Sequence, residues 1–216
     1  MNTEAQEKKF VITIGRQYGS GGREIGRLVA DMLGIKYYDK ELLTESAKAA
    51  GVKPELFEAA DERTPSFFSN LWSFNLGFNS GSYLLGSSPL SDDNIYHAQS
   101  NVMKNLAEQS SCVIVGRSAD YVLREHPYLI SVFIHSTIEA RIIRIMNRSA
   151  DIDSAEKARE TADKKDKLRA SYYNFYTDKT WGSSMSYDLS IDSSKLTSET
   201  VARIIVDYVK ARLQAK

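Results

Sequence analysis

Short apolar runs alternate along this chain with longer segments in which apolar residues recur at helical spacing. The first run, residues 10–14 (FVITI), is rich in β-branched residues and leads into a glycine-rich stretch, as a buried strand entering a loop does. From Glu24 to Leu33 the apolar residues fall three and four positions apart, and Gly34 stands where a left-handed C-cap is expected. The beginning of the chain therefore predicts a strand, a glycine loop and a helix.

The same alternation continues toward the C-terminus. Strands are expected near 10–14, 36–39, 111–116, 129–135 and 187–192. Helices are expected over 40–50, 93–109, 138–148, 154–176 and 198–213. Neighbouring parallel strands require crossover helices, which cover both faces of the sheet. The pattern therefore predicts a three-layer α/β fold with a central parallel sheet of about five strands, built as one domain over residues 1–216.

One segment departs from this pattern. Residues 65–90 contain no charged side chain and are rich in Ser, Asn, Gly and aromatic residues, and they fall within an insert expected over 52–92. The segment is interpreted either as an irregular stretch that packs its own aromatics onto the domain, or as a substrate-side flap or dimer contact. The second interpretation rests on the aromatic, uncharged composition of interface cores. A homodimer through residues 65–90 is thus one of two open hypotheses.

Composition narrows the class of protein. The 216 residues suit one sizeable domain, and 28 basic residues balance 28 acidic ones, which argues against a nucleic-acid partner. No apolar run approaches the roughly 20 residues of a membrane span, and the polar start lacks a signal-peptide core. The single cysteine, Cys112, is expected as a buried strand residue, and a cytoplasmic protein is predicted. The three histidines are dispersed, so neither a histidine- or cysteine-ligated metal site nor histidine catalysis is expected.

The glycine loop is the main candidate for chemistry. Glycines can take positive φ and let the backbone close around an anion, so that N–H groups converge on phosphate oxygens at a helix N-terminus. A strand before the loop and a helix after it are the context that a phosphate loop requires. The alternative is a glycine-rich turn selected only for tight packing. The residues expected to bind the cofactor are Gly15, Arg16, Gly19, Ser20, Gly21, Gly22, Arg23 and Glu24.

The standard phosphate-loop motif GxxxxGK[ST] is not satisfied. Gly22 stands where the lysine belongs, and Arg23 and Glu24 follow it. Either Arg16 or Arg23 is expected to supply the missing positive charge, since an arginine can bind phosphate with two hydrogen bonds. Ser20 is a candidate neighbour of phosphate or metal, and Glu24 a candidate outer-sphere metal partner.

Five blocks of the sequence together resemble the cytidylate kinase-like family, within the superfamily of P-loop nucleoside monophosphate kinases. They are VITIGRQYGSGGREIG, LGIKYYDKELL, VIVGRSADYVL, DKLRASYYNFYT and YDLSIDSSKLTSETVARII. The resemblance spans nearly the whole chain, and little is recognised between residues 52 and 90. It implies a P-loop NTPase fold, a monophosphate-binding region, a mobile lid, and ATP with Mg²⁺ as cofactors.

The resemblance also implies roles for individual residues. The pair Gly116-Arg117 matches a glycine-arginine pair whose arginine binds the acceptor nucleotide, but Ser118 follows where cytidylate kinases have an aspartate, and Asp120 lies two positions further on. This departure leaves base specificity open. The substrate-binding residues implied are Asp39, Arg117, Asp166 and Arg169. The expected catalytic residues are Arg117, Asp166 and Arg169 from the resemblance, together with Arg23 as a replacement for the missing lysine charge.

The expected lid region, residues 141–176, carries a local excess of positive charge. Nine basic residues face six acidic ones between 141 and 169. Phosphoryl transfer needs cations on the transferred group, whereas many charge runs are only solvated helix faces. The leading hypothesis is an ATP-dependent kinase for CMP, dCMP or a similar small phosphorylated acceptor. The alternatives are a nucleotide- or anion-binding regulatory module with a degenerate loop, and a kinase for a non-nucleotide small molecule.

Overall fold

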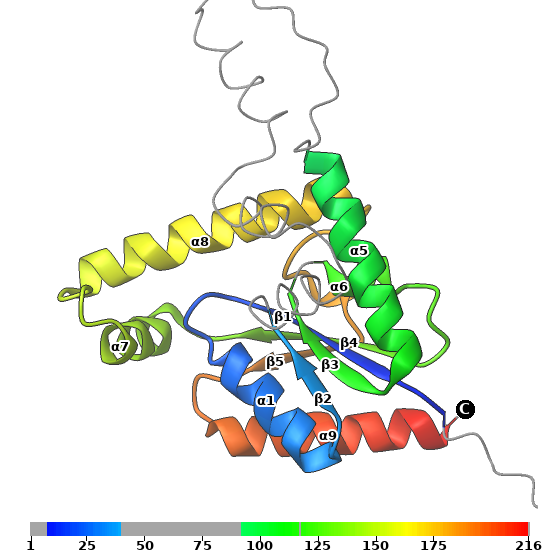
Figure 1. Cartoon of the computed structure of the whole chain (residues 1–216). Coiled ribbons are helices and arrows are strands. Elements are labelled where there is room, and N and C mark those ends of the chain that lie inside the picture. The colour runs from blue at the N-terminus through cyan, green and yellow to red at the C-terminus, as the bar shows by residue number, and fades with distance from the viewer. Residues whose placement is uncertain (1–7, 40–91, 117, 216) are drawn as a thin grey trace, which may run out of the picture.

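The computed structural model describes residues 8–39, 92–116 and 118–215 (Figure 1). The helix expected over 40–50, the uncharged segment 65–90 and Arg117 lie outside the described residues.

Five parallel strands form one sheet, which confirms the predicted α/β architecture. The strands are β1 (Val11–Arg16), β2 (Lys36–Tyr38), β3 (Cys112–Val115), β4 (Leu129–His135) and β5 (Leu189–Asp192). Their order is β2-β3-β1-β4-β5, and β1 at the centre pairs Ile12 with Val113 on one side and with Ile130 on the other. The glycine loop therefore leaves the middle of the sheet.

Helices cover both faces of this sheet. They are α1 (Gly22–Leu33), α5 (Asp92–Gln109), α6 (Ala119–Val122), α7 (Ile138–Arg148), α8 (Ala155–Tyr176) and α9 (Ser198–Gln214), with a 3-10 turn at Ser184–Ser186. Helices α1 and α9 lie on one face, and α5 and α6 lie on the other (Figure 1). This arrangement gives the three layers that the alternating pattern predicts.

The core residues explain why the chain folds in this way. Ile12 and Ile14 of β1 are completely buried against a cluster that includes Val29 of α1 and Ile205 of α9. Val11 of β1 belongs instead to the cluster on the opposite face. Each such side chain contributes roughly 1.5–3 kcal/mol by burial, and both faces of a parallel sheet are normally covered.

Three predicted details can be compared directly with the structure. Gly34 caps α1 in the left-handed region at φ 64°, as expected. Cys112 lies fully buried on β3, also as expected, and burial raises the pKa of its thiol to about 12. No helix in the described part of the chain combines the length and apolar character that crossing a bilayer requires.

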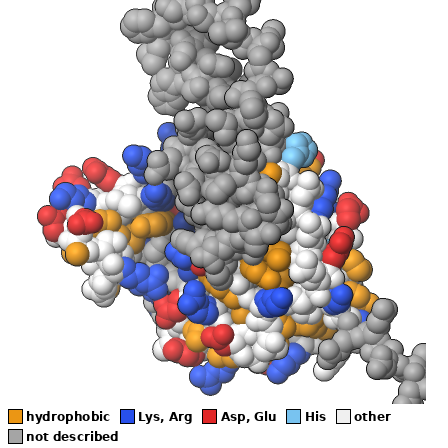
Figure 2. All heavy atoms as spheres, viewed as in Figure 1, with side chains coloured by type: hydrophobic (Ala, Val, Ile, Leu, Met, Phe, Trp, Pro, Cys, Tyr) orange, Lys and Arg blue, Asp and Glu red, His pale blue; other side chains and the backbone are white. Residues whose placement is uncertain are grey.

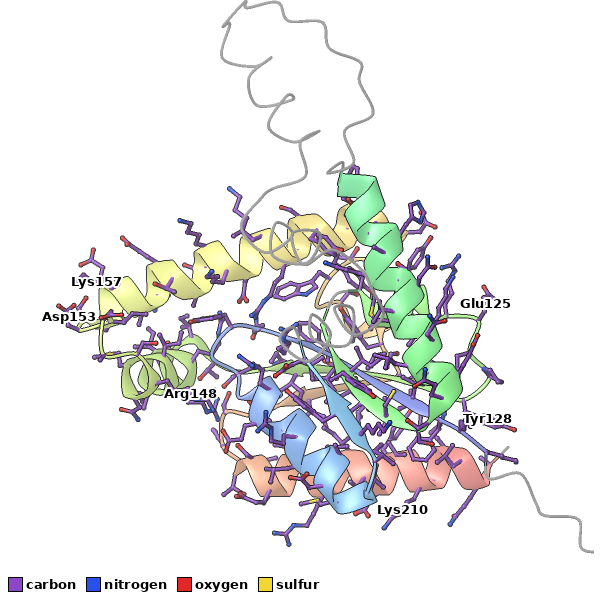
Figure 3. All side chains as sticks on the ribbon, viewed as in Figure 1. Glu125, Tyr128, Arg148, Asp153, Lys157 and Lys210 are labelled. Atoms are coloured by element: carbon purple, nitrogen blue, oxygen red, sulfur yellow. The ribbon has the colours of Figure 1, made fainter. Side chains whose placement is uncertain are left out.

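Helices α7 and α8 form an arm that projects beyond the sheet (Figure 1). They pack through Ile145, Ala158 and Ala162, each almost fully buried. Thr137 caps α7, and Ser154 caps α8, by accepting hydrogen bonds from backbone N–H groups of the first turns. Figure 3 shows Asp153 and Lys157 at the far end of this arm.

Candidate functional site

The loop between β1 and α1 has the backbone geometry of an anion-binding turn. Gly19 and Gly21 take φ angles of 79° and 83°, which other residues rarely adopt. The N–H groups of Gly22, Arg23 and Glu24 lie in the first turn of α1, where a helix supplies no acceptors and carries partial positive charge. This end of the helix is therefore prepared to receive phosphate oxygens.

Close packing also constrains the loop. A Cβ on Gly19 would lie 2.9 Å from Cγ1 of Ile145 and 3.0 Å from the carbonyl oxygen of Arg141. The glycine therefore allows both the turn and the contact with α7, so the packing interpretation and the phosphate-loop interpretation of this position do not exclude each other.

Hydrogen bonds hold the loop in place from inside. The Ser20 hydroxyl is fully buried and donates to the carbonyl of Gln17 at 2.9 Å. The Ser193 hydroxyl, after β5, contacts the carbonyl of Ser20 at 2.8 Å, and the Gln17 side chain accepts from the N–H of Ser136 at 3.0 Å. The Ser20 side chain thus stabilises the turn itself, and only its backbone remains a candidate for contact with phosphate.

A cavity of about 280 Å³ opens beside the loop, over the ends of β1 and β3 and beneath α8. Its charged lining residues are Arg16, Arg23, Asp39, Asp120, Lys165 and Arg169. Its aromatic lining residues are Tyr18, Tyr172, Tyr173, Trp181 and Tyr187. The cavity therefore combines an excess of cations with flat apolar walls.

Arg23 is directed toward the end of β2. Its Nη2 contacts Oδ2 of Asp39 at 2.7 Å, and Asp39 is only 3% exposed. The Tyr37 hydroxyl lies within hydrogen-bond distance of both the Arg23 carbonyl and the Asp39 carboxylate, at 3.2 and 3.3 Å. Burial, and then the charge of Asp39, raises the pKa of Tyr37 to about 12. The structure thus joins two predicted site residues, Arg23 and Asp39, in one ion pair.

Asp166 fixes α8 to the glycine loop. One carboxylate oxygen accepts from the N–H of Tyr18 at 2.7 Å, and the other accepts from Nη2 of Arg141 at 2.5 Å. Arg141, which is 5% exposed, also donates through Nε to the Tyr18 carbonyl at 2.7 Å. Burial raises the pKa of Asp166, while the Tyr18 N–H and Arg141 oppose this shift. Asp166 is not among the residues that line the cavity, so the structure gives it a positioning role.

Arg169, one turn further along α8, does line the cavity. Its Nη1 donates to the carbonyl of Arg16 at 3.2 Å, and its guanidinium carbon lies 5.5 Å from the centre of the Tyr18 ring. The predicted lid arginine therefore lies directly against the glycine loop.

Other basic residues of the arm serve protein contacts. Arg144 donates to the Ser193 carbonyl at 2.6 Å, and Arg148 pairs with Glu24 at 2.6 Å. Glu24 is about half exposed and does not line the cavity, and its carboxylate is paired with Arg148. Tyr176 of α8 also serves a protein contact, since its ring stacks on that of Tyr96 of α5 with ring centres 4.2 Å apart.

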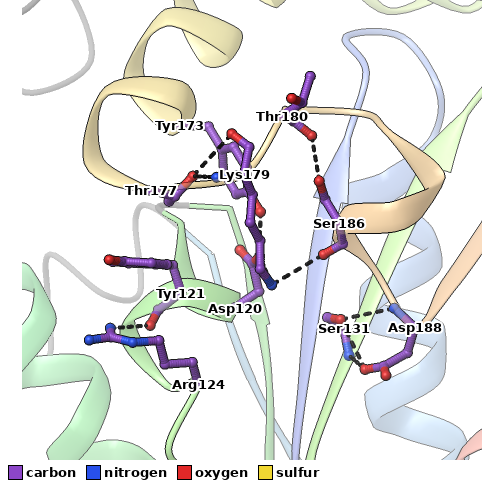
Figure 4. A network of polar contacts seen from close by, with 10 residues as sticks. All are labelled: Asp120, Tyr121, Arg124, Ser131, Tyr173, Thr177, Lys179, Thr180, Ser186 and Asp188. Atoms are coloured by element: carbon purple, nitrogen blue, oxygen red, sulfur yellow. Dashed lines mark hydrogen bonds and ion pairs between the residues drawn. The ribbon is translucent and has the colours of Figure 1, made fainter.

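Asp120 is a charged residue of the cavity that sequence reasoning noted only as a neighbour of Ser118. It is 6% exposed, accepts a hydrogen bond from the Tyr173 hydroxyl at 2.7 Å, and lies 3.9 Å from Nζ of Lys179 (Figure 4). Burial raises the pKa of Asp120, and burial together with the Asp120 charge raises the pKa of Tyr173. A buried carboxyl group with a shifted pKa in a cavity is typical of functional sites.

Two hydroxyl groups add to this polar wall. Ser118 takes a left-handed φ of 52°, a strained conformation for a residue with a side chain, and its buried Oγ has no hydrogen-bond partner among the described residues. The same holds for Oγ1 of Thr13, and both residues line the cavity. Buried hydroxyls without a partner among the described residues can bind an ordered water, an ion or a ligand group.

The residues present are compatible with Mg²⁺ only in the way that phosphate-transferring sites hold it. Among the described residues, no three His, Cys, Asp or Glu side chains gather to hold a metal. Mg²⁺ in kinase-type sites commonly uses one or two carboxylates together with substrate phosphates. Asp39 and Asp120 are the carboxylates that line the cavity.

Comparison with known proteins agrees with this description. The model of the cytidylate kinase-like family matches residues 11–195. No curated protein matches. Among solved structures, an uncharacterized protein from Eubacterium ventriosum ATCC 27560 is 29% identical, with a TM-score of 0.70 over 94% of this chain and 99% of that one.

More distant structures share the fold alone. A shikimate kinase from Bacteroides thetaiotaomicron is 11% identical, with a TM-score of 0.55 over 93% of this chain and 98% of that chain. A gluconokinase from Sinorhizobium meliloti 1021 is 14% identical, with a TM-score of 0.51 over 96% and 95% of the two chains. The fold is therefore that of the P-loop kinases.

Proposed function

This chain belongs to the cytidylate kinase-like family, and from that premise we propose that it is an ATP- and Mg²⁺-dependent phosphotransferase acting on CMP, dCMP or a similar small phosphorylated acceptor. The observation that carries the proposal is one cavity that joins the glycine loop, four basic side chains and a set of aromatic rings. The basic residues are Arg16, Arg23, Lys165 and Arg169.

This cavity suits the chemistry of phosphoryl transfer. The protein has little covalent work to do in such reactions, and catalysis comes from positioning and from cations on the transferred group. Arg169 lies against the loop, where it can neutralise charge on that group. The acceptor phosphate is already ionised at neutral pH, so its attack on the γ-phosphoryl group needs no general base.

The aromatic side chains provide the surface for the acceptor's ring. Tyr173, Trp181 and Tyr187 lie beside Asp120 and Ser118 around one cavity. Rings offer large contact area to a planar base, and the carboxylate and hydroxyls offer hydrogen bonds to its edge. ATP would be held by the backbone of the glycine loop, and Mg²⁺, when bound, would neutralise the phosphates beside Asp39 or Asp120.

A coupled assay of ADP release tests this proposal. ATP and Mg²⁺ are supplied with CMP, dCMP, UMP or AMP, and turnover is expected with at least one acceptor, cytidine nucleotides first. Replacing Arg169→Ala removes a cation from the cavity and should reduce turnover by roughly 10³-fold, the lower value for an arginine on a transferred phosphoryl group.

Arg203→Ala is the matched control, since Arg203 is an exposed residue of α9 on the opposite layer, and its turnover should equal that of the wild type. Turnover undiminished in Arg169→Ala would contradict the role of Arg169. ATP binding without turnover on any acceptor would contradict the proposal and favour a nucleotide-binding regulatory module.

The buried carboxylate of Asp120 in the cavity favours a second candidate function, with an alcohol as phosphoryl acceptor. Unlike a phosphate, an alcohol must lose a proton as its oxygen attacks phosphorus, and a carboxylate such as Asp120 can accept that proton. Asp120 would also repel an acceptor dianion more strongly than a singly charged hydroxy acid. Including gluconate and shikimate in the same panel tests this candidate, and ADP release with either one, but with no nucleotide, would replace the nucleotide proposal.

Two further parts of the proposal come from the sequence. A cytoplasmic location is expected, and a homodimer through residues 65–90 is one hypothesis for the uncharged insert. Sedimentation velocity of the full chain tests the second, since a dimer that becomes a monomer on replacing Phe67→Ser and Trp72→Ser is expected, and a monomeric wild type would contradict it.

A further inference from the structure

The glycine loop departs from the standard phosphate loop at two positions. The motif GxxxxGK places a glycine six positions before its lysine. Aligned on Gly21, that glycine falls on Arg16 and the lysine falls on Gly22. The chain therefore carries a cation where the motif has glycine, and glycine where the motif has the cation.

These two positions touch each other in the structure. A Cβ built on Gly22 would lie 2.6 Å from Cβ of Arg16, closer than real Cβ atoms approach, and 3.0 Å from its Cγ, which is also tight. The atoms in conflict are at the base of the arginine side chain, next to the backbone, so rotation of the arginine tip does not relieve them. Arg16 and any side chain at position 22 are therefore mutually exclusive.

The guanidinium of Arg16 occupies a defined place at the end of β3. A Cβ on Gly116 would lie 2.0 Å from Nη1 of Arg16, and Gly116 has a φ of 86°. The side chain thus passes in front of Gly22 at the start of α1 and reaches Gly116, and Arg16 lines the cavity. The lack of a side chain at Gly22 and at Gly116 leaves the room that the Arg16 side chain occupies.

We infer that Arg16 replaces the lysine of the standard phosphate loop, so that glycine and cation have been exchanged between positions 16 and 22 as one compensated pair. This inference rests on the proposed use of ATP and identifies Arg16, rather than Arg23, as the donor-phosphate cation. Arg23 is directed toward Asp39 at the end of β2. An arginine at this place remains charged at any physiological pH and can donate two parallel hydrogen bonds to phosphate oxygens.

The steric half of the inference is tested by thermal unfolding without any ligand. The variants are Arg16→Gly, Gly22→Lys and the double exchange that restores GxxxxGK. Because glycine is unfavourable in a helix, Gly22→Lys should raise the melting temperature where room exists, and lower it where Arg16 is present. Without the arginine, the nearest remaining atom is Oγ of Ser20 at 3.6 Å, an ordinary contact.

The expected result is therefore a change of sign: Gly22→Lys lowers the melting temperature of the wild type by several degrees and does not lower that of Arg16→Gly. Equal effects of Gly22→Lys in the two backgrounds would overturn the inference.

The functional half is tested by calorimetric titration with Mg·ATP and with inorganic tripolyphosphate. Arg16→Gln should weaken both by about tenfold or more, as loss of a charged hydrogen bond does, while the exposed control Arg203→Gln leaves both unchanged. The double exchange should bind both ligands at least tenfold more tightly than either single variant.

This experiment separates the inference from the proposed function. If no acceptor supports turnover but Arg16→Gln still loses ATP affinity, the proposed transfer is wrong and the inference stands. Unchanged ATP affinity in Arg16→Gln, or no recovery in the double exchange, would overturn the inference whatever the acceptor.

Discussion

At the scale of single residues, Asp120 is the clearest case of a charged group whose burial lowers the stability of the folded protein. Its carboxyl is 6% exposed, and burial raises its pKa even though the Tyr173 hydroxyl and Lys179 favour the charged form. Buried charge of this kind is costly, and it is retained most often where a ligand uses it.

Replacing Asp120→Asn therefore should raise stability and lower activity. The folded-state pKa of Asp120 lies above its unfolded-state value near 3.8, so the folded protein binds more protons between these two values. Stability then falls as the pH rises through this window, and the asparagine variant lacks that loss. Its gain in melting temperature over the wild type should grow as the pH rises above about 4.

Thermal unfolding of both proteins across this pH range checks the prediction. The amide oxygen can still accept the Tyr173 hydrogen bond, so the comparison isolates the charge. Turnover of the variant should fall by about tenfold or more, which corresponds to roughly 1.4 kcal/mol of transition-state stabilisation. A gain in melting temperature that does not depend on pH would contradict this account of Asp120.

At the scale of secondary-structure elements, one buried ion pair links both α7 and α8 to the glycine loop. Asp166 and Arg141 hold Tyr18 by its N–H and its carbonyl, and their side chains are 14% and 7% exposed. Asp166→Ala leaves the buried Arg141 without this partner and should cost about 3 kcal/mol of the free energy of unfolding.

Urea unfolding measures this cost against two references. Asp153→Ala removes an exposed pair with Lys157 on the same arm and should leave stability unchanged. Asp166→Asn keeps an acceptor for the Tyr18 N–H and should fall between the wild type and the alanine variant. Equal stability of Asp166→Ala and Asp153→Ala would show that this contact does not hold the arm.

The elements and their contacts also show what the sequence could and could not predict. Buried β-branched runs such as 10–14 and glycines before a helix are local signals, and they predicted the parallel sheet and the loop. The contact between Arg16 and Gly22 depends on the path of one side chain in space, so its six-residue separation gave no signal. Asp120 enters the cavity because α6 begins shortly after β3, and the letters GRSAD, which end on Asp120, were the available clue.

The net charge of the whole molecule differs from the net charge of the cavity. The 28 basic and 28 acidic residues balance, and Figure 2 shows both kinds interspersed over the visible face, including the α7–α8 arm. In the cavity, however, four basic side chains accompany two carboxylates. Positive charge is thus concentrated where a small anion would bind, and a neutral protein avoids long-range attraction of larger polyanions.

The measurement that tests the central claim most directly is identification of the product. The full chain is incubated with Mg·ATP and CMP, and nucleotides are separated by anion-exchange chromatography. The account predicts CDP and ADP in equal amounts, with ADP formation dependent on CMP. ADP without a phosphorylated acceptor, or no ADP with any acceptor of the panel, would contradict the claim that this chain is a phosphotransferase.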